Sequence, residues 1–257
     1  MDTITQGEAA VRQAFAAQAA AGKRILIVDA LQDADLRTIG AACSDMPLVT
    51  GGSGIALGLA ANFIRTGKVA PRPPQTRMVA PKGRAVVLAG SCSEATRGQI
   101  AAAQTAGLPT LGLDVDALNS GKQTAASLAA WAMAQPQDSI PVIYSSAAPA
   151  TLLAIQARLG QHSSGALVEA TLAEVGHLLQ GAGFSRYLIA GGETSGAVVA
   201  ALGVTTLEIG PEIASGVPWT RSIFGPDLVL ALKSGNFGAE DFFLKAWTLL
   251  ETEPADV

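Results

Sequence analysis

The segment Gly-Gly-Glu-Thr-Ser at residues 191–195 has the composition of a phosphate-binding turn. It follows the apolar residues 187–189, which predict a buried strand, and it precedes the apolar run 197–202, which predicts a helix. Two successive glycines let the backbone turn sharply and approach a ligand closely. We expect Thr194 or Ser195 to cap the helix, whose first N–H groups carry the positive end of the helix dipole and favour an anion. An ordinary capped strand-to-helix turn has the same pattern, so both interpretations stay open at this point.

Two other turns share this design, at residues 51–54 (Gly-Gly-Ser-Gly) and 90–93 (Gly-Ser-Cys-Ser). If the strands before them are parallel, all three turns lie at the carboxyl edge of one sheet, where ligands of open α/β sheets bind. Lys233 ends a further apolar segment and is followed by Ser-Gly-Asn. A lysine at the end of a strand can act as a point charge on a phosphate, and a solvated lysine is the alternative. Together these features favour a nucleotide phosphate site.

Acidic side chains also stand near the expected edge. They are Asp29, Asp114 and Glu193. Glu193 can reach a metal ion or a nucleotide hydroxyl from within its turn, or it can simply interact with the helix dipole. No cluster of residues with metal-ligand spacing predicts a metal site, and no catalytic base is apparent.

Several common signatures are missing from the sequence. The absence of GxxxxGK[ST] excludes a Walker-type loop, and the absence of GxGxxG after a strand disfavours a dinucleotide-dependent oxidoreductase. The segment around Ser53 does not fit GxSxG, and the two histidines, His162 and His177, fall in a region predicted to be helical. A Ser–His hydrolase is therefore disfavoured.

The elements that must position these turns alternate between strand and helix. Strands are expected at residues 25–29, 46–50, 84–89, 108–113, 140–144 and 187–189, with helices at 5–21, 34–43, 55–65, 94–106, 122–134, 149–159 and 166–180. Residues 67–82, rich in proline and basic residues, suggest a hinge. The tail predicts strands at 205–209, 219–223 and 228–232 and a closing helix at 239–251. The fold class is therefore α/β: three layers, with a mostly parallel sheet flanked by helices and a mixed or antiparallel C-terminal edge.

The composition of the chain argues against several classes of protein. The net charge of −4 with 17 scattered basic residues argues against a nucleic-acid surface. Two distant cysteines exclude a disulfide framework and favour a reduced, cytoplasmic setting. The first 21 residues lack the pattern of a signal peptide, and the longest apolar stretch, 49–64, is interrupted by glycines, so we expect no membrane association.

Five motifs occur in the order seen in the four-carbon acid sugar kinases, which this chain resembles across nearly its whole length. They are residues 28–36, 50–56, 90–93, 190–196 and 232–238. The resemblance implies ATP-dependent phosphorylation, with Mg²⁺, of a four-carbon sugar acid of the 3-oxo-tetronate, threonate or erythronate type. It further implies that the nucleotide is held by Ser91, Gly191, Gly192, Glu193, Thr194, Ser195 and Gly235.

The chain departs from this family at its beginning. Full members open with an Asp-Asp-Phe-Thr-Gly-Ala-type stretch in an N-terminal substrate domain, and residues 1–23 do not match it. We therefore expect residues 1–257 to form one nucleotide-binding domain, the family's C-terminal half, with little or no kinase activity by itself and with the N-terminal domain as its partner in cis or trans. Self-association is also expected. The alternative is a non-catalytic module that binds a nucleotide or sugar phosphate and acts through a partner chain.

Overall fold

The chain forms two compact units, Met1–Pro73 and Pro74–Val257, in a computed structural model that describes residues 2–73, 75–145 and 161–252. The boundary falls inside the expected hinge at residues 67–82. The sequence predicts one nucleotide-binding domain over residues 1–257. The first unit buries a small core of its own, around Val11, Ile39 and Cys43.

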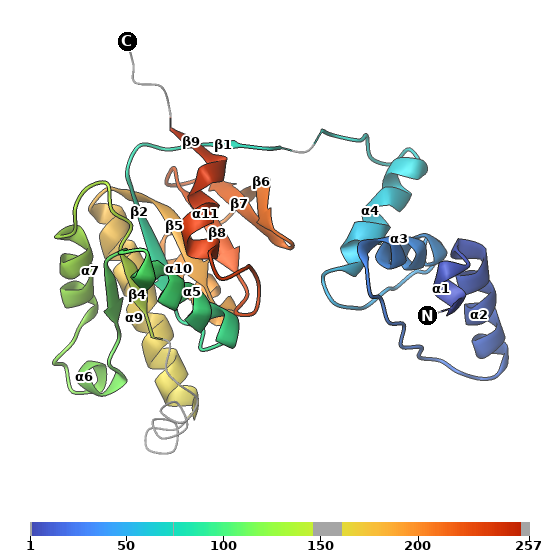
Figure 1. The fold of residues 1–257 in the computed structure, drawn as a ribbon, viewed down its shortest axis with the longest axis horizontal. Helices are drawn as coiled ribbons and strands as arrows, with labels where there is room; N and C mark the ends of the chain where they lie inside the picture. The colour runs from blue at the N-terminus through green and yellow to red at the C-terminus, as the bar shows by residue number, and fades with distance from the viewer. Residues whose placement is uncertain (1, 74, 146–160, 253–257) are drawn as a thin grey trace, which may run out of the picture. The chain divides into compact units, whose positions relative to one another are not determined.

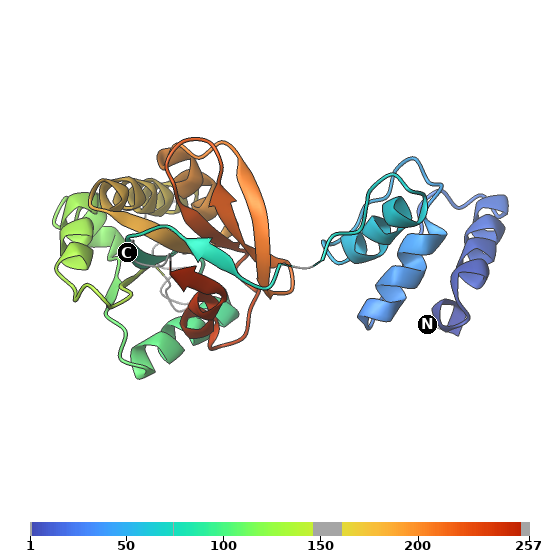
Figure 2. The same ribbon diagram turned by 90° about the horizontal axis from the view of Figure 1, so that it is seen from above.

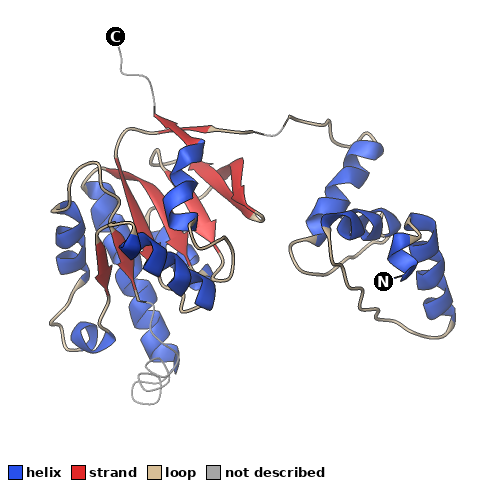
Figure 3. Ribbon diagram, in the orientation of Figure 1, coloured by secondary structure: helices blue, strands red, loops and turns tan. Residues whose placement is uncertain are grey.

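The first unit contains only helices among residues 2–73 (Figure 3). They are α1 (Asp2–Thr5), α2 (Glu8–Ala20), α3 (Asp33–Ala42) and α4 (Ile55–Arg65). The contact between α3 and α4 is very close, since a Cβ on Gly40 or Gly58 would collide with the other helix. Asn62 Nδ2 also donates a 2.7 Å hydrogen bond to the Gly40 carbonyl.

The strands expected at residues 25–29 and 46–50 are wrong, because neither segment pairs with another strand. Both run as irregular chain between helices. The turn at 51–54 consequently leads into α4 with no strand before it. It belongs to the first unit, whereas the turns at 90–93 and 191–195 belong to the second.

The second unit is built on a seven-stranded sheet in the order β3-β4-β2-β5-β8-β7-β6 (Figure 1). The strands are β2 (Arg84–Ala89), β3 (Thr110–Gly112), β4 (Val142–Tyr144), β5 (Phe184–Ala190), β6 (Leu207–Ala214), β7 (Val217–Ser222) and β8 (Val229–Lys233). The pairs from β3 to β8 are parallel, whereas β8–β7 and β7–β6 are antiparallel. This confirms the expected fold class, including the antiparallel C-terminal edge.

Helices cover both faces of this sheet (Figure 2). On one face, α7 (Ala125–Met133), α9 (Gln161–Gly181) and α10 (Gly192–Ala201) bury Leu128, Leu172 and Val198 against the strands. On the other face lie α5 (Glu94–Thr105) and the short α11 (Phe242–Lys245). A further short helix, α6 (Val115–Asn119), follows β3. The helix expected at 149–159 lies outside the described residues.

The closing helix expected at 239–251 is wrong. Helix α11 ends at Lys245, a 3₁₀ turn (Ala246–Leu249) follows, and β9 (Leu250–Thr252) pairs in parallel with β1 (Met78–Ala80). Trp219 Nε1 donates a 2.8 Å hydrogen bond to the Ala246 carbonyl, and its ring packs on Trp247 at 5.3 Å between centroids. These tertiary contacts override the helical pattern of the segment. Within the described ranges, no helix has both the length and the apolar character to cross a membrane.

Candidate nucleotide-binding site

Three parallel strands of the second unit end side by side. The register places Ala89, the last residue of β2, opposite Ala190 at the end of β5, and Ala190 opposite Lys233 at the end of β8. Backbone hydrogen bonds continue the ladder into the loops, from Gly191 N–H to the Lys233 carbonyl (2.8 Å) and from Gly90 N–H to the Ala190 carbonyl (2.9 Å). The turns at 90–93, 191–195 and 234–236 therefore share one edge of the sheet.

The two central loops diverge toward opposite faces of the sheet. The loop after β2 leads into α5 on one face, and the loop after β5 leads into α10 on the other. Neighbouring parallel strands with this arrangement create a crevice at their carboxyl ends, which is the usual ligand site of an open α/β sheet. Ser91 and Gly191 lie at this switch point.

The turn after β5 begins its helix earlier than the sequence suggested. Gly191 is the N-cap of α10, with φ of 128°, and no side chain caps the helix. The expected capping role of Thr194 or Ser195 is wrong, because both residues lie inside the first turn and are buried. Thr194 instead packs its side chain against Gly90 and Gly191, where a Cβ on Gly90 would collide with Thr194 Oγ1.

The first turn of α10 offers unpaired backbone donors. The first helical hydrogen bond runs from Ser195 N–H to the Gly191 carbonyl, so the N–H groups of residues 192–194 have no intrahelical acceptor. Gly192 and Glu193 are exposed, and a Cβ on Gly192 would meet no atom within 4 Å. This geometry suits a phosphate, which accepts hydrogen bonds from such N–H groups and from the positive end of the helix.

Lys233 is fully buried, so the expectation that it is a solvated lysine is wrong. Its ammonium donates hydrogen bonds to Thr96 Oγ1 (3.1 Å), the Ser234 carbonyl (3.1 Å) and the Gly235 carbonyl (2.7 Å). Burial lowers the pKa of this lysine to about 8. Because its three protons are directed at protein oxygens, Lys233 organises the loop after β8 and is not aimed at a ligand as a point charge.

The loop after β8 rests on the first turns of α5. The Gly235 carbonyl also accepts hydrogen bonds from Ser93 Oγ (2.6 Å) and Thr96 Oγ1 (3.0 Å). Gly235 has no room for a side chain, because a Cβ there would collide with Ser91 Oγ. Further along, Gln99 Nε2 lies 3.0–3.1 Å from three successive carbonyl oxygens, at residues 237–239. The loop is thus held in one conformation by buried polar groups.

Sequence reasoning placed Ser93 in the turn at 90–93 but did not assign Thr96 and Gln99 to the site. The signal was present, because polar side chains at the start of α5 repeat every three residues and therefore share one face. Ser93 caps α5 by accepting a hydrogen bond from Thr96 N–H, and Thr96 and Gln99 are completely buried.

Ser195 differs from these residues. Its side chain is 8% exposed, and its Oγ finds no hydrogen-bond partner among the described residues. A buried hydroxyl without a partner costs stability, commonly about 1–3 kcal/mol. Ser91, in contrast, accepts a 3.2 Å hydrogen bond from Ser93 N–H.

The other two acidic candidates, Asp114 and Asp29, do not belong to these three loops. Asp114 caps α6 by accepting hydrogen bonds from the N–H groups of Asp116 and Ala117, and Asp29 belongs to the first unit. No group of three or more His, Cys, Asp or Glu side chains that could hold a metal ion occurs within the residues that the structure describes. His177 is exposed on α9.

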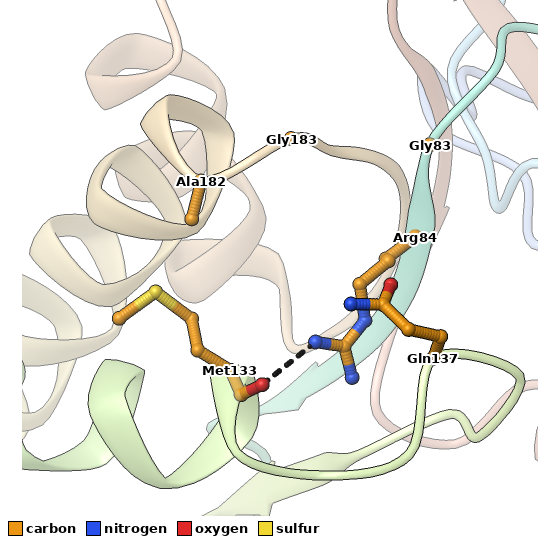
Figure 4. Close-up of a pocket in the computed structure, with 6 residues that line it drawn as sticks. All are labelled: Gly83, Arg84, Met133, Gln137, Ala182 and Gly183. Atoms are coloured by element: carbon orange, nitrogen blue, oxygen red, sulfur yellow. Dashed lines mark hydrogen bonds between the residues drawn. The ribbon is translucent and has the colours of Figure 1, made fainter.

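A pocket of about 480 Å³ lies at the opposite edge of the sheet, where β2 and β5 begin (Figure 4). Its one charged residue, Arg84, donates hydrogen bonds to the carbonyls of Met133, Ala132, Gln135 and Pro136, and its guanidinium stacks over Phe184 at 4.6 Å. Arg84 therefore satisfies the carbonyls at the end of α7. These contacts give Arg84 a structural role.

Comparison with protein families identifies the two parts of the chain. Residues 86–243 match the model of a nucleotide-binding C-terminal domain, and residues 1–59 match that of a sugar-binding N-terminal domain. The chain belongs to the four-carbon acid sugar kinase family. The second match falls on a segment that the sequence analysis placed within the nucleotide-binding domain.

Individual members of this family are similar along nearly all of the chain. The 3-oxo-tetronate kinase of Pseudomonas savastanoi pv. phaseolicola is 48% identical over 245 residues, and that of Burkholderia multivorans is 47% identical over 250 residues. A crystal structure of a Salmonella typhimurium LT2 protein superposes with a TM-score of 0.75 at 40% identity, covering 95% of this chain and 57% of that one. The chain spans 56% and 58% of the length of these two curated relatives.

Proposed function

We propose that the second unit of this chain binds ATP with Mg²⁺ and supplies the nucleotide half of a kinase for a four-carbon sugar acid of the 3-oxo-tetronate, threonate or erythronate type. The observation that carries the proposal is the register of Ala89, Ala190 and Lys233, which brings three glycine-containing loops to one edge of the sheet. The similarity to 3-oxo-tetronate kinases supports the substrate class.

In this proposal, the triphosphate lies against the loops after β2, β5 and β8. The N–H groups at the start of α10 bind phosphate oxygens, Ser91 and Ser195 offer hydroxyl groups, and Gly192 leaves room for the ligand. Gly235 lets the loop after β8 approach Ser91 closely. Glu193 is exposed in the same turn, where it can reach a hydroxyl of the nucleotide or a hydrated Mg²⁺. Phosphoryl transfer depends mainly on alignment and on charge stabilisation, which such loops and a phosphate-bound Mg²⁺ supply.

The chain by itself is expected to be inactive or weakly active. The acceptor sugar acid and a base for its hydroxyl group would come from the sugar-binding domain, of which only residues 1–59 match here. Activity should therefore appear when the part of that domain beyond the match to residues 1–59 is added. If addition of that part yields ATP binding without any turnover, the alternative of a non-catalytic binding module is favoured.

The test is a calorimetric titration with ATP and Mg²⁺, with NAD as the control ligand. Gly192→Val should weaken ATP binding by at least about tenfold, roughly 1.4 kcal/mol, because the new side chain points into open space where the ligand would lie. Ala200→Val is the matched control, since Ala200 is exposed near the far end of the same helix. Equal ATP affinity of the two variants, or tighter binding of NAD than of ATP, would refute the proposal.

A further inference from the structure

Residues 25–29, Ile-Leu-Ile-Val-Asp, have the side-chain alternation of a β-strand without a sheet. Ile25 and Ile27 are 87% and 92% exposed, whereas Leu26 and Val28 are 39% and 37% exposed. A period of two is the pattern of a strand whose two faces meet different surroundings. Here one face is turned toward the helices of the first unit, and the other carries two large apolar side chains in solvent.

The backbone of this segment is also unpaired. Lys23 N–H still bonds to the Gln18 carbonyl at the end of α2, and Leu31 N–H bonds to Asp35 Oδ2 at the start of α3. Between those two anchors, the backbone groups of residues 24–30 make no hydrogen bond to another backbone group of the described residues. An apolar strand with unpaired N–H and C=O groups is a template for pairing with another strand.

The half-buried face of the segment is loosely packed. Residues 26–29 line a groove of about 250 Å³ together with Val11 and Phe15 of α2 and Ile4 of α1. The segment therefore has room to settle closer to α2 when its backbone pairs with another strand. Residues 46–50 repeat the arrangement, because they also lie between two helices and expose Leu48 to 82%. Two short strands at residues 25–29 and 46–50 would form at best a marginally stable sheet by themselves. A stable sheet would therefore need additional strands.

We propose that residues 25–29, here called the docking segment, pair as an added strand with a sheet edge in the remaining part of the sugar-binding domain. This partner is favoured because residues 1–59 match the sugar-binding N-terminal model and because the relatives are much longer than this chain. Ile25 and Ile27 then enter the apolar core of that domain, and the backbone completes a ladder of hydrogen bonds. The inference extends the proposed function by naming the surface through which the two halves of the site are joined.

The experiment is co-expression of the tagged full chain with the part of the Pseudomonas savastanoi relative that this chain does not cover. We expect the two polypeptides to purify together, and we expect amide hydrogen exchange at residues 25–29 to slow by at least about tenfold in the complex, since these N–H groups gain acceptors. Ile27→Pro should abolish co-purification because proline lacks the N–H group and disrupts a ladder. Ile27→Thr keeps the N–H group and strand propensity, and it should retain most of the complex.

Several outcomes would overturn this inference. They are the absence of a complex, a complex that Ile27→Pro leaves intact, and a complex without slower exchange at the docking segment. Amide exchange at residues 25–29 could also slow as the concentration of this chain alone is raised, with a dimer detected by light scattering. That result would assign the segment to contact with a second copy of this chain, and it would also overturn the inference. Circular dichroism should show Ile27→Pro to be folded, as expected for a residue 92% exposed.

These readouts do not involve ATP, so the two proposals can fail separately. Gly192→Val should form the complex as the unaltered chain does, and Ile27→Pro should bind ATP to the same extent as the unaltered chain does by itself. Failure of the unaltered chain to bind ATP, with an intact complex, would count against the proposed function alone.

Discussion

The ammonium group of Lys233 lies 2.7 Å from the carbonyl oxygen of Gly235, only two residues further along the chain. This hydrogen bond turns the Gly235 carbonyl toward α5, where Ser93 and Thr96 also reach it. Because a trans peptide unit is planar, the N–H group of Asn236 points in the opposite direction, away from this cluster. A buried lysine therefore determines which backbone group the loop presents to its exposed side.

Lys233→Met should weaken ATP binding by about tenfold, roughly 1.4 kcal/mol, while the fold stays intact. Methionine fills a similar apolar volume, but the loop loses the charged donor that fixes the Gly235 carbonyl. Titration calorimetry measures the affinity, and Lys245→Met serves as the control because Lys245 is exposed on α11. Equal affinity of Lys233→Met and the unaltered chain would show that the loop conformation does not depend on this lysine.

The same lysine predicts a pH dependence of stability. Its pKa is lowered from 10.5 to about 8 in the folded chain, so between these values the unfolded chain binds a proton that the folded chain has released. The contribution of Lys233 to the free energy of unfolding should therefore be constant below about pH 8 and should rise from there to about pH 10.5. Urea denaturation at a series of pH values should show the unaltered chain gaining stability relative to Lys233→Met in this window. Parallel curves for the two proteins would contradict it.

Two adjacent glycines should respond differently to substitution. Gly191→Ala should destabilise the fold by about 1–3 kcal/mol, since Gly191 has φ of 128° and a Cβ there would lie 2.9 Å from Thr194 Oγ1. Gly192→Ala should change the free energy of unfolding by no more than about 0.5 kcal/mol, because its Cβ meets no atom. Denaturant titrations measure the free energy of unfolding of both variants. A similar loss of stability in both would show that Gly191 and Gly192 do not have the different surroundings given above.

Ser195→Ala should leave the ligand-free protein as stable as before or stabilise it by about 1 kcal/mol, because it removes a buried hydroxyl that lacks a partner. Ser222→Ala is the matched control, since the equally buried Ser222 donates a 3.0 Å hydrogen bond to the Phe224 carbonyl. That control should lose about 1 kcal/mol. A loss of comparable size from Ser195→Ala would mean that its hydroxyl is already satisfied.

The sequence allowed prediction of the features of the second unit that depend on local pattern. The apolar runs that became β2, β5 and β8 and the glycine turns after them are visible in the residues themselves. Their meeting at one edge followed from the rules of parallel sheets and was confirmed for the turns at 90–93 and 191–195. The turn at 51–54 obeyed the same local pattern, yet its strand has no sheet to join, and no local pattern reveals the absence of partners.

The buried contacts of the site could not be predicted from the sequence, because they join residues that are far apart along the chain. The burial of Lys233 requires Thr96, which is 137 residues away, to offer an acceptor. Likewise, Thr194 takes no part in capping because Gly90 leaves space for its side chain. The apolar run at residues 25–29 predicted a strand that the structure does not contain, because pairing is a property of two segments and not of one.

The parallel pairing of β1 with β9 places Met78 beside Leu250, at the two ends of the second unit. The polypeptide thus comes into this unit and goes out of it at neighbouring points, with the whole seven-stranded sheet in between. Such an arrangement permits modular exchange: the unit can be transplanted into a surface loop of another protein, or its ends can be joined and new ends opened elsewhere, without disturbing the strands that carry the three loops.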